Sequence, residues 1–333
     1  MKKRRRKPTK TVDELVDEWT QVSHSNQQLS GVRDLVRFLS GELYSEYKPI
    51  LEKPLFWNRL AAWLQNVTST SDRQRMLELV PWLLFIGQNE LEWMERAALT
   101  GPITRWIIED ARLDITDLNL TARVNEEIGR TFFAGIAGQF DDFLRINGLG
   151  GQSYRPILRD LAKSQEFLLL DREIKKGRYR RVVAVEDMVG SGTQMEEAAA
   201  TIAHLAPRNV LLCPIVVAPA GVERWVNELK PRGDMTHVSF SPLFVIPQNA
   251  TIPMVPSAGD ELIEVKKFRE LLQRTWHQVE GKSPDNQLYG PFGFGHFGSL
   301  VLSYRNCPDN VPPLVHYDGD MWNSLFPRVP REK

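Results

Sequence analysis

One stretch of this sequence decides its fold: Arg181-Val-Val-Ala-Val-Glu-Asp-Met-Val-Gly-Ser-Gly-Thr-Gln-Met195. Its apolar run from Val182 to Val185 is typical of a parallel strand that is buried on both faces. Two carboxylates, Glu186 and Asp187, stand at the carboxyl end of that run. Because an unpaired buried charge is costly, we expect this end of the strand to open onto water, a cation or a polar ligand.

A turn with two glycines, Gly190 and Gly192, separates the acids from an apolar pattern of helical spacing that includes Met195. The first N–H groups of a helix lack partners and carry partial positive charge, so they bind anions. Glycines let the backbone approach an anion closely, and the hydroxyls of Ser191 and Thr193 add donors. Acids beside such a phosphate site suit sugar hydroxyls or the water shell of magnesium. The stretch therefore predicts a site for a ribose 5-phosphate.

Two other interpretations of the turn compete with this one. A P-loop requires Gly-Lys-Ser/Thr, and Thr193 directly follows Gly192, so the P-loop interpretation fails. An ordinary strand–turn–helix connection stays open, but the adjacent acids and the paired glycines make it the less favoured alternative.

The block resembles the 5-phosphoribosyl diphosphate signature of the type I phosphoribosyltransferase superfamily, in which four apolar residues, two acids and two apolar residues precede a short Thr/Gly loop. The resemblance implies that Glu186 and Asp187 act at the ribose hydroxyls and hold magnesium. It also implies that a phosphate loop wraps the 5-phosphate, and this loop comprises Val189, Gly190, Ser191, Gly192, Thr193 and Gln194.

Two positions depart from the superfamily pattern. Gly190 stands where many members have Thr or Asp, and that Asp is a proposed proton-transfer group in purine-using members. Gln194 stands where Ser, Thr or Ala is usual. A base at position 190 is therefore absent, and one phosphate contact is expected to change.

Composition indicates a globular protein of about two domains. The 333 residues include 42 basic and 42 acidic ones, so no global charge favours nucleic acid or a membrane. The two cysteines, Cys213 and Cys307, fit neither a metal site nor a disulfide framework, and a reducing cytoplasm is the expected location. Apolar runs such as 79–86 and 210–222 are shorter than the roughly 20 residues that span a bilayer, and no secretory signal is visible.

A short tail and two domains are expected along the chain. Residues 1–10 carry seven basic residues and predict a disordered tail, which either stays in solvent or rests on nucleic acid. Residues 11–120 predict a helical domain that begins with a capping box of Thr11 and Glu14 and serves a partner-binding or regulatory role. Its predicted helices cover 33–47, 56–67, 73–86 and 90–110, with Gly101-Pro102 as punctuation.

Residues 121–333 predict an α/β phosphoribosyltransferase-like domain with a mostly parallel sheet and right-handed crossovers. Its strands are expected at 131–137, 182–185, 209–217 and 238–246, and its helices at 153–169, 195–205, 222–229 and 261–279. Pro214 predicts that its strand lies at a sheet edge or ends there.

Other polar features of this domain have weaker claims. A loop is expected at 138–151, where Arg145 is either a donor to a diphosphate or, as we favour, a surface arginine. The basic turn at 175–178 precedes the strand and so lies at the wrong sheet edge for phosphate. The letters Gly293-Phe-Gly-His-Phe-Gly298 match a dinucleotide fingerprint, but a strand rather than a helix is predicted to follow. We instead expect a pocket-flanking loop containing Phe292, Phe294 and His296.

A second resemblance covers most of residues 55–333. It links the chain to the phosphoribosyltransferase-like proteins of prokaryotic conflict systems, some of which are effectors beside retron reverse transcriptases. It rests on the 186–193 run, the Gly-Phe-Gly loop at 293–295, Asn306-Cys-Pro-Asp-Asn310 with Pro312-Pro313, and Trp322 with Leu325-Phe-Pro-Arg328.

This second resemblance implies a toxic effector of antiphage defence that acts on phosphoribosyl diphosphate or a nucleotide by phosphoribosyl transfer or cleavage of an N-glycosidic bond. A complex of reverse transcriptase and nucleic acid is an expected partner, and an oligomer is compatible with the sequence. Two alternatives stay open: a catalytically silent module that senses a nucleotide and controls an assembly, and modification of nucleic acid guided by the basic tail.

Overall fold

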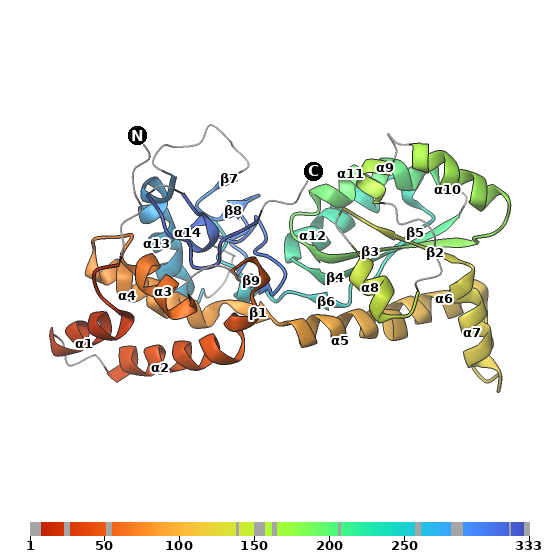
Figure 1. The fold of residues 1–333 in the computed structure, drawn as a ribbon. Helices are drawn as coiled ribbons and strands as arrows, with labels where there is room; N and C mark the ends of the chain where they lie inside the picture. The colour runs from red at the N-terminus through yellow and green to blue at the C-terminus, as the bar shows by residue number, and fades with distance from the viewer. Residues whose placement is uncertain are drawn as a thin grey trace. The chain divides into compact units, whose positions relative to one another are not determined.

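The computed structural model describes most of the chain, namely residues 8–22, 27–50, 55–137, 140–149, 157–161, 165–205, 208–256, 261–280, 289–319 and 321–329. Contacts divide the chain into two compact units (Figure 1). The sheet unit is Asn89–Pro247. The terminal unit combines Met1–Gln88 with Gln248–Lys333.

The sheet unit is built on five parallel strands, as the alternation of strands and helices predicts. The strands are β2 (Thr131–Gly135), β3 (Arg181–Val189), β4 (Asn209–Val217), β5 (Val238–Phe240) and β6 (Phe244–Val245). Their order is β2-β3-β4-β5, and β6 pairs with the end of β4. The apolar run of β3 lies between its neighbours, with Val182 paired to Phe132 and Val210, and is fully buried.

Helices cover both faces of this sheet, as a parallel sheet of apolar strands requires. One face buries Val182 and Ala184 against apolar residues of α9, α10 and α11. On the other face Phe133 contacts Phe143 of α8, with ring centroids 6.1 Å apart. The helical elements of the unit are α5 (Gln88–Ala98), η4 (Leu99–Ile103), α6 (Thr104–Ala111), α7 (Leu120–Gly129), α8 (Asp141–Ile146), α9 (Leu158–Leu161), α10 (Gln165–Lys175), α11 (Thr193–His204), α12 (Pro219–Arg224), η5 (Trp225–Leu229) and η6 (Gly233–Met235).

The prediction drawn from Pro214 is wrong, because β4 pairs with β3 on one side and with β5 and β6 on the other. The carbonyl of Pro214 accepts from the N–H of Leu243 at 2.9 Å, so its nitrogen also faces the β5–β6 side. The missing N–H therefore falls where the pairing with β5 has ended and that with β6 has not begun. A central strand tolerates the proline because its neighbour is interrupted there.

Two other local predictions also need correction. Gly101-Pro102 does not interrupt the helical run, since the five-residue π-helix η4 contains Pro102 and continues into α6. The hydroxyl of Thr104 donates to the carbonyl of Leu99 at 2.6 Å and satisfies an acceptor of this turn. The loop expected at 138–151 contains helix α8, which starts with two acids that suit the helix dipole; residues 138–139 and 150–151 lie outside the described ones.

The terminal unit is mainly helical. Its elements are α1 (Val12–Val22), α2 (Gln27–Glu42), η1 (Tyr44–Glu46), η2 (Lys48–Ile50), α3 (Phe56–Leu64), α4 (Thr70–Leu79), η3 (Val80–Trp82), β1 (Leu84–Ile86), η7 (Gln248–Ala250), α13 (Ile263–Glu280), β7 (Tyr289–Gly290), β8 (Gly293–Phe294), β9 (Val301–Ser303) and α14 (Pro313–His316). The capping box is confirmed, because the Thr11 N–H donates to Glu14 at 2.7 Å and the Glu14 N–H donates to the Thr11 hydroxyl at 3.2 Å. The backbone N–H and the hydroxyl of Thr11 both donate to the Glu14 carboxylate, and these two hydrogen bonds lower the pKa of Glu14.

The helix predicted over 73–86 is wrong at its end. Pro81, which lacks an N–H, lies in η3 after α4 has ended, and Leu84–Ile86 forms a strand paired in parallel with β9. The tail expected to be disordered over residues 1–10 is held at its end, where the backbone N–H groups of Thr9 and Lys10 donate to the Gln65 side chain. Residues 1–7 lie outside the described part of the chain.

The carboxyl-terminal tail packs onto the amino-terminal helices within this unit. The Tyr47 hydroxyl donates to the Pro327 carbonyl at 2.8 Å, and the Trp63 indole donates to the Leu314 carbonyl at 2.6 Å. Phe326 packs against the rings of Tyr44, Tyr47, Phe56 and Phe85. The tail residues that carry the second resemblance therefore supply core of the terminal unit.

The compact units group the chain differently from the domains 11–120 and 121–333 expected above. Helices α5 to α7 belong with the parallel sheet, and residues 248–333 belong with the first helices. The physical reason is burial, because the sheet needs a second covered face and the tail buries its aromatic rings among the first helices. No helix within the described ranges is long and apolar enough to cross a bilayer.

Candidate functional site

The candidate site begins inside strand β3. The strand runs on to Val189, past the predicted end at Val185, so Glu186 and Asp187 are part of it. Pairing with β2 ends at Val185, opposite Gly135, whereas pairing with β4 continues to Val189. The two acids therefore lie where β3 extends beyond its neighbour at the carboxyl edge of the sheet.

Glu186 is almost completely buried, with 2% of its surface exposed. Its Oε2 accepts a hydrogen bond of 2.8 Å from the backbone N–H of Ala137, which follows β2. This burial differs from the expectation that both acids open onto solvent or a ligand. The hydrogen bond to Ala137 also fixes the backbone where the chain leaves β2, beside the site.

Asp187 is half-buried, and its Oδ1 accepts a hydrogen bond of 2.8 Å from the N–H of Met188. Successive residues of a strand point to opposite faces, so Glu186 and Asp187 do not share one. The structure thus places the two acids side by side along the chain but in different surroundings. Of the two, Asp187 is the more accessible.

The phosphate loop leads directly into helix α11, as the sequence predicts. Gly192 is the N-cap residue and has φ 76° and ψ 0°, a left-handed conformation that favours glycine. The helix starts at Thr193, and its first backbone hydrogen bond runs from the Glu196 N–H to the Gly192 carbonyl at 3.0 Å. Inside the helix, the first N–H groups have no carbonyl partners, so the loop presents backbone donors at the positive end of a twelve-residue helix.

Two hydroxyls lie within this loop. The Ser191 and Thr193 oxygens are 2.9 Å apart, and the Thr193 N–H donates to the Ser191 hydroxyl at 3.3 Å. The Ser191 side chain thereby occupies the first helical N–H, while Gln194 and Met195 supply the next two. The hydroxyl pair and these two N–H groups form a set of donors suited to phosphate oxygens.

Helix α12 supports the loop from the end of the neighbouring strand β4. A Cβ placed on Gly221 would lie 3.0 Å from the Gly190 carbonyl oxygen and 2.9 Å from a methyl group of Val217. Glycine is therefore needed at 221 for α12 to approach the loop this closely. The carboxyl ends of two adjacent parallel strands thus build the site together.

Arg224 of α12 is a site residue that the sequence analysis missed. Its Nη1 lies 3.4 Å from the Thr193 hydroxyl and 2.7 Å from Oε2 of Glu196, and its Nε lies 3.6 Å from Glu228. A Cβ on Gly192 would be 3.1 Å from the Arg224 Cδ. The order of the elements could have indicated Arg224. The carboxyl ends of adjacent parallel strands lie at one edge of a sheet, and Arg224 follows β4, the strand after the phosphate loop.

Comparison with known proteins places this chain in a family. The sequence model of the family PRTase-CE matches residues 60–328. The chain belongs to the PRTase-CE family. No match is found among curated proteins or among solved structures.

Membership of PRTase-CE supports a phosphoribosyltransferase-like function, and the parallel sheet with preceding helices is consistent with that fold. The match covers β3, the phosphate loop and α12. The individual roles of the residues from Glu186 to Gln194 are predictions.

Magnesium was also expected in this PRTase-CE protein. Among the described residues, no group of three or more His, Cys, Asp and Glu side chains could hold a metal ion. Mg²⁺ is, however, commonly held by one or two carboxylates together with substrate phosphates and water. The donor set of Asp187 and a neighbouring diphosphate fits this chemistry, whereas Glu186 already accepts the Ala137 N–H.

The remaining sequence-selected residues belong to elements other than β3, the phosphate loop and α12. Arg145 is an exposed arginine of α8 paired with Asp142 at 3.1 Å, as favoured above. The basic side chains of the 175–178 turn are exposed to solvent, as expected, and they pair with acids of α10. His296 belongs to the terminal unit, where β8 is followed by a turn and not by a helix, so rejection of the dinucleotide fingerprint is confirmed.

Proposed function

We propose that this PRTase-CE protein binds a 5-phosphoribosyl donor, either phosphoribosyl diphosphate or a nucleotide, at the carboxyl edge of β3 and β4. The observation that carries this proposal is the Gly192-capped start of α11, directly after the acids of β3. It unites anion donors and a carboxylate within one short segment, and a phosphorylated sugar requires both.

Each part of the segment has a separate task in this proposal. The N–H groups of Gln194 and Met195, with the hydroxyls of Ser191 and Thr193, bind the 5-phosphate. Asp187, the more accessible acid, accepts hydrogen bonds from the ribose hydroxyls. Glu186 holds the Ala137 backbone at the exit of β2 and so keeps the neighbouring wall of the site in place.

The proposed reaction is displacement at C1 of the ribose, either by an acceptor or by water. Such a displacement passes through a cationic, oxocarbenium-like state, and a protein assists by fixing the sugar and placing negative charge near it. Asp187 would supply both effects because it holds the ring and carries a carboxylate. Magnesium, when bound, would neutralise the departing diphosphate.

The proposed biological role is that of a toxic effector in antiphage defence of the retron type. Its support is the resemblance of the 186–193 run and the tail residues to proteins of prokaryotic conflict systems. A reverse transcriptase with its nucleic acid is the corresponding proposed partner. Cell killing that depends on Asp187 and on infection would test this role separately from the chemistry.

A second candidate is a binding module that senses a nucleotide without turning it over. Two observations favour it: Gly190 offers no proton-transfer group, and Glu186 is buried in a contact with the backbone. Single-turnover assays with labelled phosphoribosyl diphosphate and magnesium distinguish the two candidates. Released diphosphate supports the enzyme, whereas binding without product supports the module.

Direct binding tests what the two candidates share. Calorimetry with phosphoribosyl diphosphate, ribose 5-phosphate and a nucleoside monophosphate should show saturable binding of at least one of them by the full chain. If the folded protein binds none of the three at millimolar concentrations, the proposed site is refuted.

A further inference from the structure

The ion pair of Arg224 and Glu196 lies beside the phosphate loop and has no role in the proposed function. Arg224 comes from α12, yet its Nη1 touches the Thr193 hydroxyl inside the loop at 3.4 Å. The same nitrogen is held at 2.7 Å by Glu196, which lies in the first turn of α11. One cation therefore contacts both the loop and an acid of the helix that the loop opens.

Arg224 is well placed to bind an anion at the loop. Its side chain is only 26% exposed and is held against Gly192, so little conformational freedom would be lost on binding. A guanidinium has five N–H donors and binds phosphate through two at once. None of its contacts with the described residues uses Nη2.

Glu196 opposes a phosphate at the same place. Its side chain is half exposed, so its ion pair with Arg224 is worth little in water and is easily exchanged. A carboxylate bound to the guanidinium occupies donors that a phosphate would use and adds repulsion. A phosphate dianion carries more charge and more acceptor oxygens than the carboxylate, so it is the stronger partner.

We propose that Arg224 is a phosphate-binding residue and that Glu196 competes with the ligand phosphate for it. This inference rests on the proposed function, because it assigns a further donor to the same site. In the free protein Glu196 holds the guanidinium beside Thr193; on binding, the guanidinium turns to the phosphate. Glu196 then lowers affinity and sets the phosphate concentration at which the site fills.

Two substitutions should shift affinity in opposite directions. Arg224→Ala should weaken binding of ribose 5-phosphate and phosphoribosyl diphosphate about 10- to 100-fold, the loss expected for a charge-assisted hydrogen bond. Glu196→Gln should tighten it about two- to five-fold, because the competing ion pair is a weak one. Calorimetry on the full chain measures both changes in affinity. A purely structural role of Arg224 would not produce the tighter binding of Glu196→Gln.

Glu197→Gln is the matched control for charge. It changes the neighbouring residue of the same helical turn by the same charge, but Glu197 faces Arg159 at 3.7 Å and not Arg224. Its affinity should equal that of the parent within about two-fold. An equal gain in Glu197→Gln and Glu196→Gln would show a general charge effect and would overturn the competition.

The outcomes separate this inference from the proposed function. If the parent protein binds neither ligand, the proposed function fails. If the parent binds but Arg224→Ala binds equally well, this inference fails and the proposed function stands. Should Arg224→Ala not fold, Glu196→Gln still decides, because unchanged affinity in that variant contradicts the competition.

Discussion

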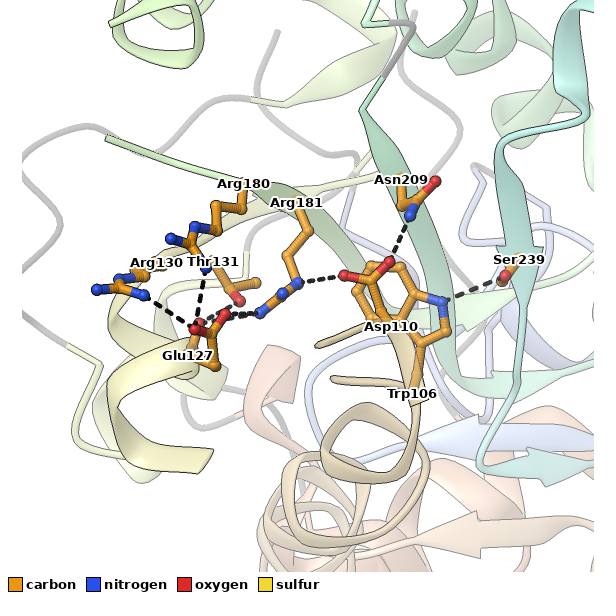
Figure 2. A network of polar contacts seen from close by, with 9 residues as sticks. All are labelled: Trp106, Asp110, Glu127, Arg130, Thr131, Arg180, Arg181, Asn209 and Ser239. Carbon is orange, nitrogen blue, oxygen red and sulfur yellow. Dashed lines mark hydrogen bonds and ion pairs between the residues drawn. The ribbon is translucent and has the colours of Figure 1, made fainter. Parts of the chain in front are cut away.

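The two edges of the parallel sheet use charge in opposite ways. At the amino edge, Arg181 opens β3 and is 3% exposed, with its Nε 2.7 Å from Asp110 and its Nη1 2.8 Å from Glu127 (Figure 2). Asn209, at the start of β4, also donates to Asp110. At the carboxyl edge, the same strand leads into backbone donors at a helix end.

This difference separates stability from binding along one strand. At the amino edge the acids of α6 and α7 and the arginine of β3 satisfy one another, which ties both helices to the sheet. Figure 2 also shows the Trp106 indole donating to Ser239 of β5 at 3.3 Å on the same edge. At the carboxyl edge, backbone N–H groups without intrahelical partners are available to donate hydrogen bonds to a ligand. The comparison predicts that substitutions at one edge should change stability and at the other affinity.

The largest expected effect is at the amino edge. Arg181→Met removes the buried guanidinium that Asp110, 12% exposed, and the buried Glu127 share, which should destabilise the sheet unit by about 3–5 kcal/mol. Urea unfolding measures this loss. The control is Arg180→Met, whose side chain is 56% exposed and lies 3.4 Å from Glu127, and it should cost less than about 1 kcal/mol. Equal losses in the two variants would contradict a special role of the buried pairs.

Acid should weaken the terminal unit through His316. Burial lowers its pKa to about 4, from an ordinary value of 6.5. The unfolded chain therefore binds a proton at His316 more tightly than the folded chain does. The free energy of unfolding keeps its full value above pH 6.5 and falls as the pH drops towards 4. The loss at that pH is about 3 kcal/mol.

His316 lies outside the sheet unit, so this loss of stability in acid should be independent of the charges at the two sheet edges. Urea unfolding of the parent and of His316→Asn at several pH values separates the contribution of His316 to the pH dependence from that of the other titratable groups. The variant should lose most of the pH dependence between 6.5 and 4. If it keeps the full slope, the acid sensitivity arises from other carboxylates or histidines.

Asp187→Asn should show the reverse pattern of Arg181→Met. Loss of the carboxylate should weaken binding of phosphoribosyl diphosphate by about 1.5–3 kcal/mol, with the unfolding free energy nearly unchanged. Asp234→Asn is the control, because this exposed acid of the same unit pairs with Arg232. A variant at 187 that binds as tightly as the parent would remove the acid from the site.

The smallest expected change is Gly192→Ala. The left-handed φ of 76° and the 3.1 Å approach to Arg224 make alanine unfavourable by about 1–2 kcal/mol. The same change should disturb the phosphate loop and weaken ligand binding. Gly233→Ala is the comparison, because nothing lies within 4 Å of its added Cβ and its φ is not positive. If Gly192→Ala retains both stability and affinity, the loop does not need this conformation.

Sequence patterns predicted the central elements well because those elements depend on local signals. The apolar runs gave β3 and β4, and the glycine turn gave the start of α11. Predictions failed where neighbours decide. Pro214 fits a central strand only because β5 and β6 leave a gap beside it, and Leu84–Ile86 is a strand only because β9 pairs with it.

The candidate site shows the same limit. The sequence identified the acids and the phosphate loop as adjacent letters with complementary chemistry. It could not show that Glu186 is turned inward to the Ala137 N–H, because that partner lies 49 positions earlier in the chain. It also could not place Arg224 beside Thr193, since their contact depends on how α12 packs at Gly221.

The sequence alone determined that this chain forms a parallel α/β sheet with a phosphate-type loop after β3, because periodicity, glycine and helix-end chemistry act over a few residues. Only the tertiary structure decided which charges are buried with partners, as at Arg181, and which groups gather around the loop, as at Arg224. Burial and charge pairing depend on residues brought together from distant parts of the chain, and no short-range pattern encodes them.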